Sequence, residues 1–301
     1  MSEWRSVRVP ASSANLGPGF DAMGMALDVY LECRFRAAGE VRIRAEGRDA
    51  EKISTREDNL IWEIARGTGL RGGIDLLIAN AIPIGKGLGS SAAAVVAGVV
   101  IGAELAELDW DRARILDEAV KLEGHPDNAA PCVLGGIVAS AADSCGRVHA
   151  VRVQMPDAFG VAVIVPDYAV PTAEARAVLP ETYSRKDAIF NVQRAALLAA
   201  ALASGNCDAF PTALEDRMHQ PYRFALVPGL EEITALRAPG LLGCALSGAG
   251  PSILAFYERG HEAVCERVRE IFSKHGRDAE ILWTRVPASG YELSTAPAPA
   301  T

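Results

Sequence analysis

The spacing of apolar and polar residues predicts a chain that mixes strands and helices. Short apolar runs, and one segment in which apolar and charged residues alternate, are typical of strands. These strands are expected at residues 7–10, 26–35, 41–45, 74–79, 135–141, 150–153, 160–165, 242–246 and 253–257. Longer segments predict helices at residues 59–67, 92–105, 110–122, 188–203, 230–237 and 262–275. Asp58 and Asp109 are the expected N-caps of the first and third helices.

The order of these elements bears on fold class and domain organisation. Strands and helices do not alternate as regular βαβ units, which favours an α+β fold. Met155-Pro156-Asp157 interrupts two predicted strands, so we expect two domains at residues 1–155 and 156–301. Residues 294–301, rich in alanine and proline, are expected to form a disordered tail.

Composition narrows the classes of function. Hydrophobic residues make up 50% of the 301 residues, as expected of a soluble globular protein. The formal net charge of −8 argues against nucleic acid as a partner, although a small anionic ligand needs only a local positive site. No signal-peptide pattern is visible, and no apolar run reaches the ~20 residues of a membrane span. Six cysteines without metal-ligand spacing indicate reduced, mostly buried thiols in a cytoplasmic protein with no membrane association.

The densest chemical signal is a glycine-rich loop at residues 83–91 that opens into a helix. Glycines at alternate positions allow tight turns, and the unpaired N–H groups at a helix start favour a phosphate. A strict Walker loop is excluded because Gly87, and not Ser or Thr, follows Lys86. Residues 87–92 also satisfy the dinucleotide pattern G-x-G-x-x-A, although Pro83 interrupts the approach from the strand. A phosphate loop, a dinucleotide loop and a loop without ligand therefore stay open at this point.

Two further glycine-bearing segments lie far from this loop in the sequence. Residues 10–21 read Pro-Ala-Ser-Ser-Ala-Asn-Leu-Gly-Pro-Gly-Phe-Asp, and residues 247–252 read Ser-Gly-Ala-Gly-Pro-Ser between two apolar runs. Asn and Asp are common in turns for local reasons, so the first segment alone is either a turn or a site. The third segment alone has a hairpin connection as its alternative explanation.

Taken together and in this order, the three segments resemble the GHMP kinase superfamily. The middle one resembles its P-x-x-x-G-L-G-S-S-A-A phosphate loop. Further likeness to the homoserine kinases lies at residues 10–21, 125–131, 171–176 and 220–223. The resemblance implies a two-domain GHMP kinase fold, with an N-terminal ribosomal protein S5 domain 2-like part and a C-terminal ferredoxin-like α/β sandwich. In one departure from many relatives, Glu123-Gly124 runs directly into His125.

The resemblance implies ATP and Mg²⁺ as cofactors and assigns residues to both. Asn59 resembles the position that contacts adenine, with a plain helix-start residue as the alternative. Ser91 and Glu123 would supply oxygens to Mg²⁺, and Asp117 is the fallback for the glutamate. Lys86 would add charge, unless it is a solvated loop lysine. The residues expected to bind nucleotide are Asn59, Pro83, Gly85, Lys86, Gly87, Leu88, Gly89, Ser90, Ser91 and Ala92.

The resemblance also implies L-homoserine as substrate and O-phospho-L-homoserine, a threonine precursor, as product. Arg176 and Arg223 would bind the carboxylate, and Asp21 would bind the ammonium. Asn15, His125 and Asp127 are the catalytic candidates near the hydroxyl, with Asp127 the general-base candidate by residue type and His125 alternatively a turn residue. The full set of expected substrate-binding residues is Asn15, Asp21, His125, Asp127, Thr172, Arg176, Arg223 and Gly248.

Three rival functions remain open from the sequence. One is another GHMP kinase that acts on a different hydroxy amino acid or a mevalonate-like substrate. The second is a dinucleotide-dependent oxidoreductase, and the third is a non-catalytic nucleotide-binding protein. The expected partners are the two small-molecule substrates and a second copy of the chain in a homodimer, with no nucleic acid and no membrane.

Overall fold

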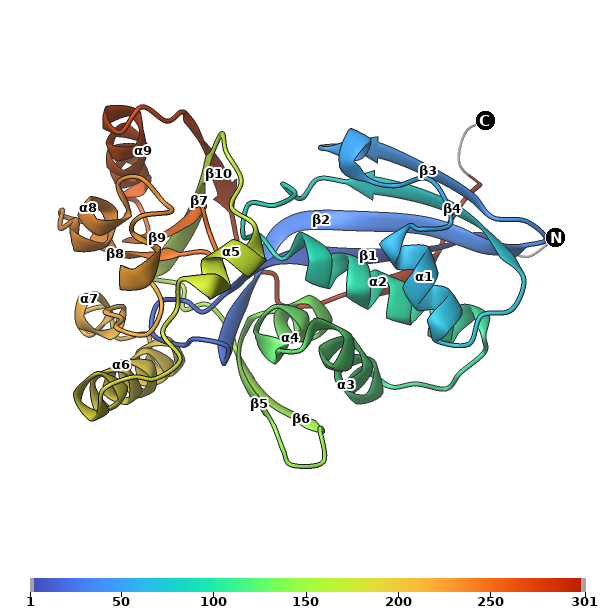
Figure 1. Cartoon of the computed structure of the whole chain (residues 1–301), viewed down its shortest axis with the longest axis horizontal. Coiled ribbons are helices and arrows are strands. Elements are labelled where there is room, and N and C mark those ends of the chain that lie inside the picture. Colours follow the sequence, from blue (N-terminus) through green and yellow to red (C-terminus); the bar gives the residue numbers. More distant parts are fainter. Residues whose placement is uncertain (1–2, 299–301) are drawn as a thin grey trace.

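Two β-sheets carry the fold in this computed structural model, which describes residues 3–298 (Figure 1). The first sheet has the strand order β11 (Glu292–Thr295), β1 (Arg5–Ala14), β2 (Met23–Ala38), β4 (Gly73–Asn80) and β3 (Arg42–Gly47). Two more strands extend it from β2: β5 (Ile137–Ala142) pairs with β2, and β6 (Val148–Val153) pairs with β5. The second sheet has the order β10 (Ala279–Thr284), β7 (Phe159–Pro166), β9 (Ile253–Glu258) and β8 (Leu241–Leu246). All pairs are antiparallel except β3 with β4.

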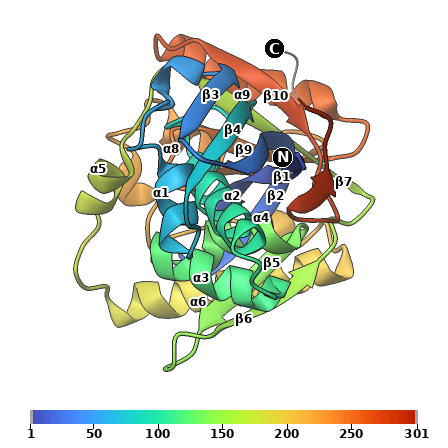
Figure 2. The ribbon, with the colours of Figure 1, turned by 90° about the vertical axis from the view of Figure 1, so that its right-hand side faces the viewer.

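Helices cover the first sheet on one face, as the end-on view shows (Figure 2). These helices are α1 (Leu60–Gly67), α2 (Ser90–Leu105), α3 (Arg112–Glu123) and α4 (Pro126–Leu134). Helices α2 and α4 lie directly on β1 and β2, and α1 packs against α2. Helix α2 is apolar on every side and almost wholly buried, because it is enclosed by the sheet and its neighbouring helices.

The second sheet is covered on both faces. Alternate residues of β9 point to opposite sides, so Leu254 and Phe256 join the large core shared with the first sheet while Ile253 and Ala255 join a smaller one. The large core also takes side chains from α6 (Arg185–Ser204) and α7 (Phe210–Ala213), and the smaller one is closed by α8 (Leu230–Ala235) and α9 (Cys265–Lys274). The remaining short helices are α5 (Thr172–Ala177) and the 3₁₀ turns Ala50–Lys52, Pro221–Arg223 and Glu262–Val264.

The structure confirms every predicted strand and helix but corrects several bounds and caps. The first helix is capped by Asn59, whose Oδ1 accepts the N–H groups of Ile61 and Trp62, so the expected cap Asp58 is wrong. The third is capped by Asp111 instead of Asp109. The tail prediction is wrong for residues 294–296, because β11 pairs with β1 and Ala296 continues the contact. Residues 299–301 of that prediction lie outside the described part.

Helices α4, α5 and α7 and strands β10 and β11 have no counterpart in the sequence prediction. Gly124 ends α3, where it forms the C-cap with a positive φ of 85°. Pro126 then occupies the first turn of α4, where its missing N–H costs nothing. Strand β10 has no fully buried residue, and its apolar run is only three residues long, Ile281 to Trp283, which is short for a strand signal.

The chain crosses from the first sheet to the second between Val153 and Phe159, close to the expected boundary. The last strand, β11, returns to the first sheet, which a division at residue 155 does not anticipate. The two-domain division at residues 1–155 and 156–301 therefore stays a prediction.

The structure bears on two expectations drawn from the sequence, one about membrane spans and one about the cysteines. Within residues 3–298, the structure contains no helix with both the length and the apolar character that a membrane crossing needs. The six cysteines are unpaired, and four of them, Cys33, Cys132, Cys244 and Cys265, are buried.

The close packing of α1 on α2 gives a test of the fold. A Cβ added at Gly98 would lie 2.8 Å from the Cβ of Ile64. We expect Gly98→Val to lower the free energy of unfolding by about 1–3 kcal/mol, because overpacking forces the two helices apart. Urea unfolding followed by circular dichroism measures this change.

The matched control is Gly67→Ala, at an exposed site where an added Cβ meets nothing within 4 Å. It should change the free energy of unfolding by less than about 1 kcal/mol. Equal midpoints for wild type and Gly98→Val would contradict this account of the α1–α2 contact.

Candidate active site

The three glycine-bearing segments, distant in sequence, meet and hydrogen-bond to one another. The N–H of Ser12 donates to the carbonyl of Leu88, 3.1 Å away, which joins the first segment to the middle one. The N–H of Gly248 donates to the carbonyl of Ala14, also at 3.1 Å, which joins the third segment to the first. The segments therefore form one structural unit at the junction of the two sheets.

The contacts between these segments leave no room for side chains. A Cβ at Gly87 would lie 2.2 Å from the carbonyl oxygen of Ser247, and one at Gly89 would lie 2.0 Å from Oγ of Ser12. Both glycines also adopt positive φ, 76° and 65°. Glycine is required here for both reasons.

These segments border a cavity of about 520 Å³. It is lined by all of the sequence-predicted site residues except Pro83 and Lys86. Those lining residues are Asn15, Asp21, Asn59, Gly85, Gly87, Leu88, Gly89, Ser90, Ser91, Ala92, Glu123, His125, Asp127, Thr172, Arg176, Arg223 and Gly248. The predicted site residues, which come from both halves of the chain, therefore border one cavity.

The start of α2 faces this cavity. Gly89 is the N-cap, and Ser90, Ser91 and Ala92 form the first turn. The N–H groups of a first helical turn have no partner within the helix, and together with the helix dipole they favour a bound anion. A phosphate at this position would meet these N–H groups and the two serine hydroxyls.

Ser91 and Glu123, the two expected metal ligands, lie together. Oγ of Ser91 donates to Oε1 of Glu123 at 3.1 Å, which joins the start of α2 to the end of α3. Burial raises the pKa of the Glu123 carboxyl, and no Lys or Arg pairs with it in the part of the chain that is described. A carboxylate that lacks a cationic partner fits a metal ion. Asp117 is unsuited as the fallback, because it lies outside the cavity lining and its Oδ1 accepts the N–H of Val148.

Lys86 does not take the orientation that the sequence suggested. Its ammonium donates to the carbonyls of Pro166 and Tyr168, at 2.7 and 2.6 Å, and the residue is only 9% exposed. Burial lowers the pKa of this ammonium. Lys86 therefore links the glycine loop to the end of β7. This role differs from the two that the sequence suggested, a phosphate-binding charge and a solvated lysine.

Asn59 has a structural role that does not depend on a ligand. Its Oδ1 caps α1, and its Nδ2 donates to the carbonyl of Ser54 at 2.5 Å. The residue borders the cavity but is 3% exposed. Contact between Asn59 and adenine stays a prediction.

The two charges expected to hold a substrate's ammonium and carboxylate bind each other. Both guanidinium nitrogens Nη1 and Nη2 of Arg176 donate to the carboxylate of Asp21, at 3.2 and 2.8 Å. The two side chains are 39% and 35% exposed at the cavity edge. This pair presents opposite charges side by side to the cavity.

Arg223 lies deeper, at 2% exposure. Its Nε donates to the carbonyl of Ala175 at 3.0 Å, and its Nη1 contacts Nδ1 of His219 at 2.9 Å and the carbonyl of Gly248 at 3.2 Å. Burial, with a contribution from nearby Arg176, lowers the pKa of Arg223 to about 10. Its Nη2 has no hydrogen-bond partner within the described residues, and the side chain borders the cavity.

Asn15, His125 and Asp127 occupy the centre of the site. Nδ2 of Asn15 donates to the carbonyl of Gly248 at 3.0 Å, and its Oδ1 accepts the N–H of Asp21 at 3.0 Å. Nδ1 of His125 lies 3.1 Å from Oδ1 of Asp127, and this hydrogen bond raises the pKa of His125. One ligand atom from each of Asp21, His125 and Asp127 lies within 4.8 Å of the others.

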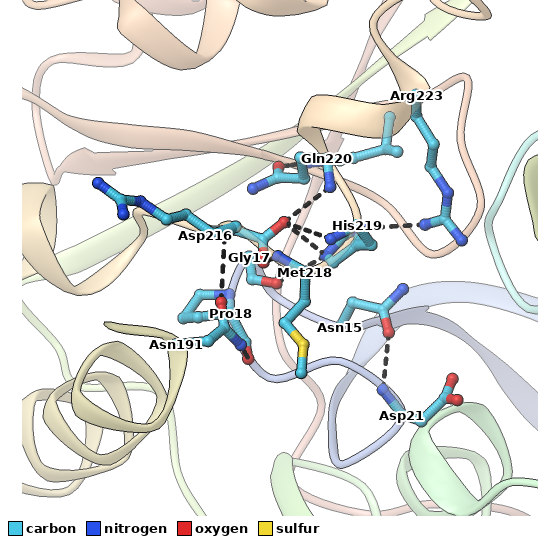
Figure 3. A network of polar contacts seen from close by, with 12 residues as sticks. Asn15, Gly17, Pro18, Asp21, Asn191, Asp216, Met218, His219, Gln220 and Arg223 are labelled. Carbon is cyan, nitrogen blue, oxygen red and sulfur yellow. Dashed lines mark hydrogen bonds and ion pairs between the residues drawn. The ribbon is translucent and has the colours of Figure 1, made fainter. Parts of the chain in front are cut away.

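Sequence reasoning missed a buried polar network behind the site (Figure 3). Both carboxylate oxygens of Asp216 accept backbone N–H groups of the following turn. Nδ2 of Asn191 donates to the carbonyl of Pro18 at 2.7 Å. Nε2 of His219 contacts the carbonyl of Gly17 at 2.7 Å. These residues carry no local motif of their own: Asp216 and His219 lie close in sequence to residues 220–223, but Asn191 does not.

Comparison with known proteins agrees with this geometry. The family model "GHMP kinases N terminal domain" matches residues 59–136, and "GHMP kinases C terminal" matches residues 195–277. A homoserine kinase of Solibacter usitatus is 61% identical over 300 residues, covering 98% of this chain and 99% of that protein. One from Deinococcus radiodurans is 41% identical, covering 95% of each chain.

Solved structures show the same fold. A homoserine kinase from Cytophaga hutchinsonii superposes with a TM-score of 0.85 at 28% identity, covering 98% of both chains. A Lactococcus lactis galactokinase, at 16% identity, has a TM-score of 0.68 over 96% of this chain and 95% of its own, which shows the shared fold alone. The α+β fold expected from the sequence is thereby confirmed. The chain belongs to the homoserine kinases of the GHMP kinase family.

Proposed function

We propose that this chain transfers the γ-phosphoryl group of ATP to the side-chain hydroxyl of L-homoserine, which gives O-phospho-L-homoserine and ADP. The observation that supports it most strongly is the Asp21–Arg176 pair, which borders the same cavity as the glycine-rich helix start of α2. A zwitterionic amino acid needs one group of each charge, and a phosphoryl donor needs the helix start.

The substrate's two charged groups have separate partners in this proposal. The ammonium binds Asp21, and the carboxylate binds Arg176 together with Nη2 of Arg223. Because Nε and Nη1 of Arg223 already donate to protein acceptors, Arg223 contacts the carboxylate through one nitrogen and not through a two-nitrogen fork. Thr172, at the start of α5, and Gly248 would border the same end of the substrate.

The phosphate end is supplied by the loop before α2 and by the pair Ser91 and Glu123. In this proposal the backbone of residues 85–91 holds the phosphates, and these two side chains hold Mg²⁺. A bound Mg²⁺ neutralises charge on the phosphate oxygens, which phosphoryl transfer requires.

The hydroxyl is expected between Asn15 and Asp127. Asp127 lies in the first turn of α4 and borders the cavity, and because it is only 2% exposed, little water competes for its carboxylate. We propose that Asp127 orients the hydroxyl and accepts its proton, with His125 holding the carboxylate through their hydrogen bond.

The proposal includes two further expectations, one about the location of the protein in the cell and one about its assembly. A cytoplasmic location fits an enzyme that uses ATP and a free amino acid. A homodimer is supported by exposed apolar side chains on α6, among them Ile189 and Val192 at 48% and 70% exposure, which a second copy would cover.

The activity is tested by ADP release with L-homoserine, L-serine, L-threonine and mevalonate in parallel. We expect L-homoserine to give the highest kcat/KM. L-Serine lacks one methylene, which places its hydroxyl short of the phosphate, and a difference of roughly 10- to 200-fold is expected. No turnover with homoserine but turnover with another acceptor would reject the substrate and keep the kinase. No turnover with any acceptor would favour a non-catalytic nucleotide-binding protein.

The carboxylate site is tested by Arg223→Ala. Loss of a charge-assisted hydrogen bond should raise the homoserine KM roughly 10- to 100-fold, while the KM for ATP changes less than about twofold. The control is Arg194→Ala, because Arg194 pairs with Glu215 and does not border the cavity. Equal losses for both substrates in Arg223→Ala would count against the carboxylate role.

The metal site is tested by Glu123→Gln, which keeps the shape of the side chain and removes its charge. We expect the Mg²⁺ concentration for half-maximal rate to rise roughly tenfold or more and kcat to fall. Asp117→Asn is the matched control and should leave the Mg²⁺ dependence unchanged. An unchanged Mg²⁺ dependence in Glu123→Gln would remove Glu123 from the metal site.

A further inference from the structure

His219 is fully buried, and it lies between the first glycine segment and Arg223 at the end of the cavity where the substrate is expected. Its Nε2 lies 2.7 Å from the carbonyl oxygen of Gly17, in the first glycine segment. Its Nδ1 lies 2.9 Å from Nη1 of Arg223 (Figure 3). The imidazole therefore bridges the loop that carries Asp21 and the arginine expected to bind carboxylate.

These two contacts determine the tautomer of the ring. A carbonyl oxygen only accepts, so Nε2 of His219 must carry the hydrogen and donate to Gly17. An arginine only donates, so Nδ1 must present its lone pair to Arg223. Burial, together with the nearby Arg223, lowers the pKa of His219, in keeping with this neutral form.

A count of the N–H donors of Arg223 shows what the lone pair on Nδ1 of His219 contributes. A guanidinium has five N–H donors. Nε of Arg223 uses one for Ala175, and Nη1 uses two for His219 and Gly248. The two donors on Nη2 have no protein acceptor within the described residues, and Arg223 borders the cavity. The contact with His219 thus helps to fix the orientation in which Nη2 is left for a ligand.

The imidazole itself is held on two further sides. Oδ2 of Asp216, a fully buried carboxylate, lies 3.5 Å from Nε2 of the His219 ring and also accepts the backbone N–H groups of His219 and Gln220 at 3.1 and 2.7 Å. The ring of Phe20 stacks on His219 with centroids 5.2 Å apart, and it also lies 5.8 Å from the guanidinium carbon of Arg223. His219 therefore has little freedom to turn away from Arg223.

We propose that His219 is a positioning residue for carboxylate recognition: its Nδ1 holds the Arg223 guanidinium so that Nη2 points into the cavity. The inference rests on the proposed function and deepens it. His219 does not touch the substrate, and its effect passes through Arg223.

Two substitutions separate the two contacts of the ring. His219→Asn places an amide oxygen near the position of Nδ1, so it keeps an acceptor for Arg223 and loses the bond to Gly17. His219→Gln places an amide near the position of Nε2, so it keeps the bond to Gly17 and loses the acceptor for Arg223. Each variant loses one buried hydrogen bond, which makes each a matched control for the other.

The measurements are KM for homoserine, KM for ATP and kcat in wild type and both variants. We expect His219→Gln to raise the homoserine KM roughly 10- to 100-fold and His219→Asn to raise it less than about threefold, with both KM values for ATP within about twofold of wild type. Combined with Arg223→Ala, His219→Gln should add no further increase in the homoserine KM, because the two act through one contact.

Equal homoserine KM values in the two variants, or an additive effect with Arg223→Ala, would overturn the positioning role. A wild type without homoserine-dependent turnover would instead overturn the proposed function, so the two failures are distinguishable.

The wild-type chain gives a second test that needs no folded variant. In ¹⁵N NMR of labelled imidazoles, Nδ1 of His219 should resonate as a non-protonated nitrogen and should shift when L-homoserine is added. It should stay unchanged with 3-amino-1-propanol, which has the hydroxyl and ammonium but no carboxylate. A protonated Nδ1, or no shift with homoserine, would overturn the inference.

Discussion

Backbone contact among three glycine-bearing segments is the constraint on which the site depends. Hydrogen bonds join Ser12 to Leu88 and Ala14 to Gly248, and the glycines at 87 and 89 leave no space for a Cβ at the contacts. Because the segments come from both sheets, this contact also fixes the two sheets relative to each other at the cavity. The phosphate end and the substrate end are therefore parts of one packed unit and not two independent loops.

The charges around the cavity differ in how firmly they are held. Arg223 is buried and Glu123 is partly buried, and burial lowers the pKa of Arg223 and raises that of Glu123, whereas both side chains of the Asp21–Arg176 pair are more than a third exposed. An exposed ion pair contributes only about 0–1 kcal/mol to stability. A zwitterionic ligand can therefore separate Asp21 from Arg176 and bind both side chains at low cost. Buried residues thus set the geometry, and the exposed pair adapts to the ligand.

Much of the fold and site follows from sequence, for reasons that particular residues illustrate. The glycine loop before α2 is recognisable because phosphate binding and close backbone approach both require glycine at fixed spacing. Asp21, Arg176 and Arg223 were identified by the resemblance. The orientation of Lys86 was not predictable, because its acceptors Pro166 and Tyr168 lie some eighty residues away in the sequence. His219 was missed because it carries no motif of its own: Gly17, which its Nε2 contacts, lies 202 residues away, and its contact with Arg223 exists only in the folded chain.

The central claim is that Asp21, Arg176 and Arg223 fix the two charged ends of homoserine so that the hydroxyl meets the phosphate. The most direct measurement is the site of phosphorylation in the product, determined by ³¹P NMR and by treatment with hydroxylamine. The account predicts a phosphate monoester on the side-chain oxygen, stable to hydroxylamine. An acyl phosphate, which hydroxylamine would convert to a hydroxamate, would show that the carboxylate faces the phosphate loop and would contradict the account.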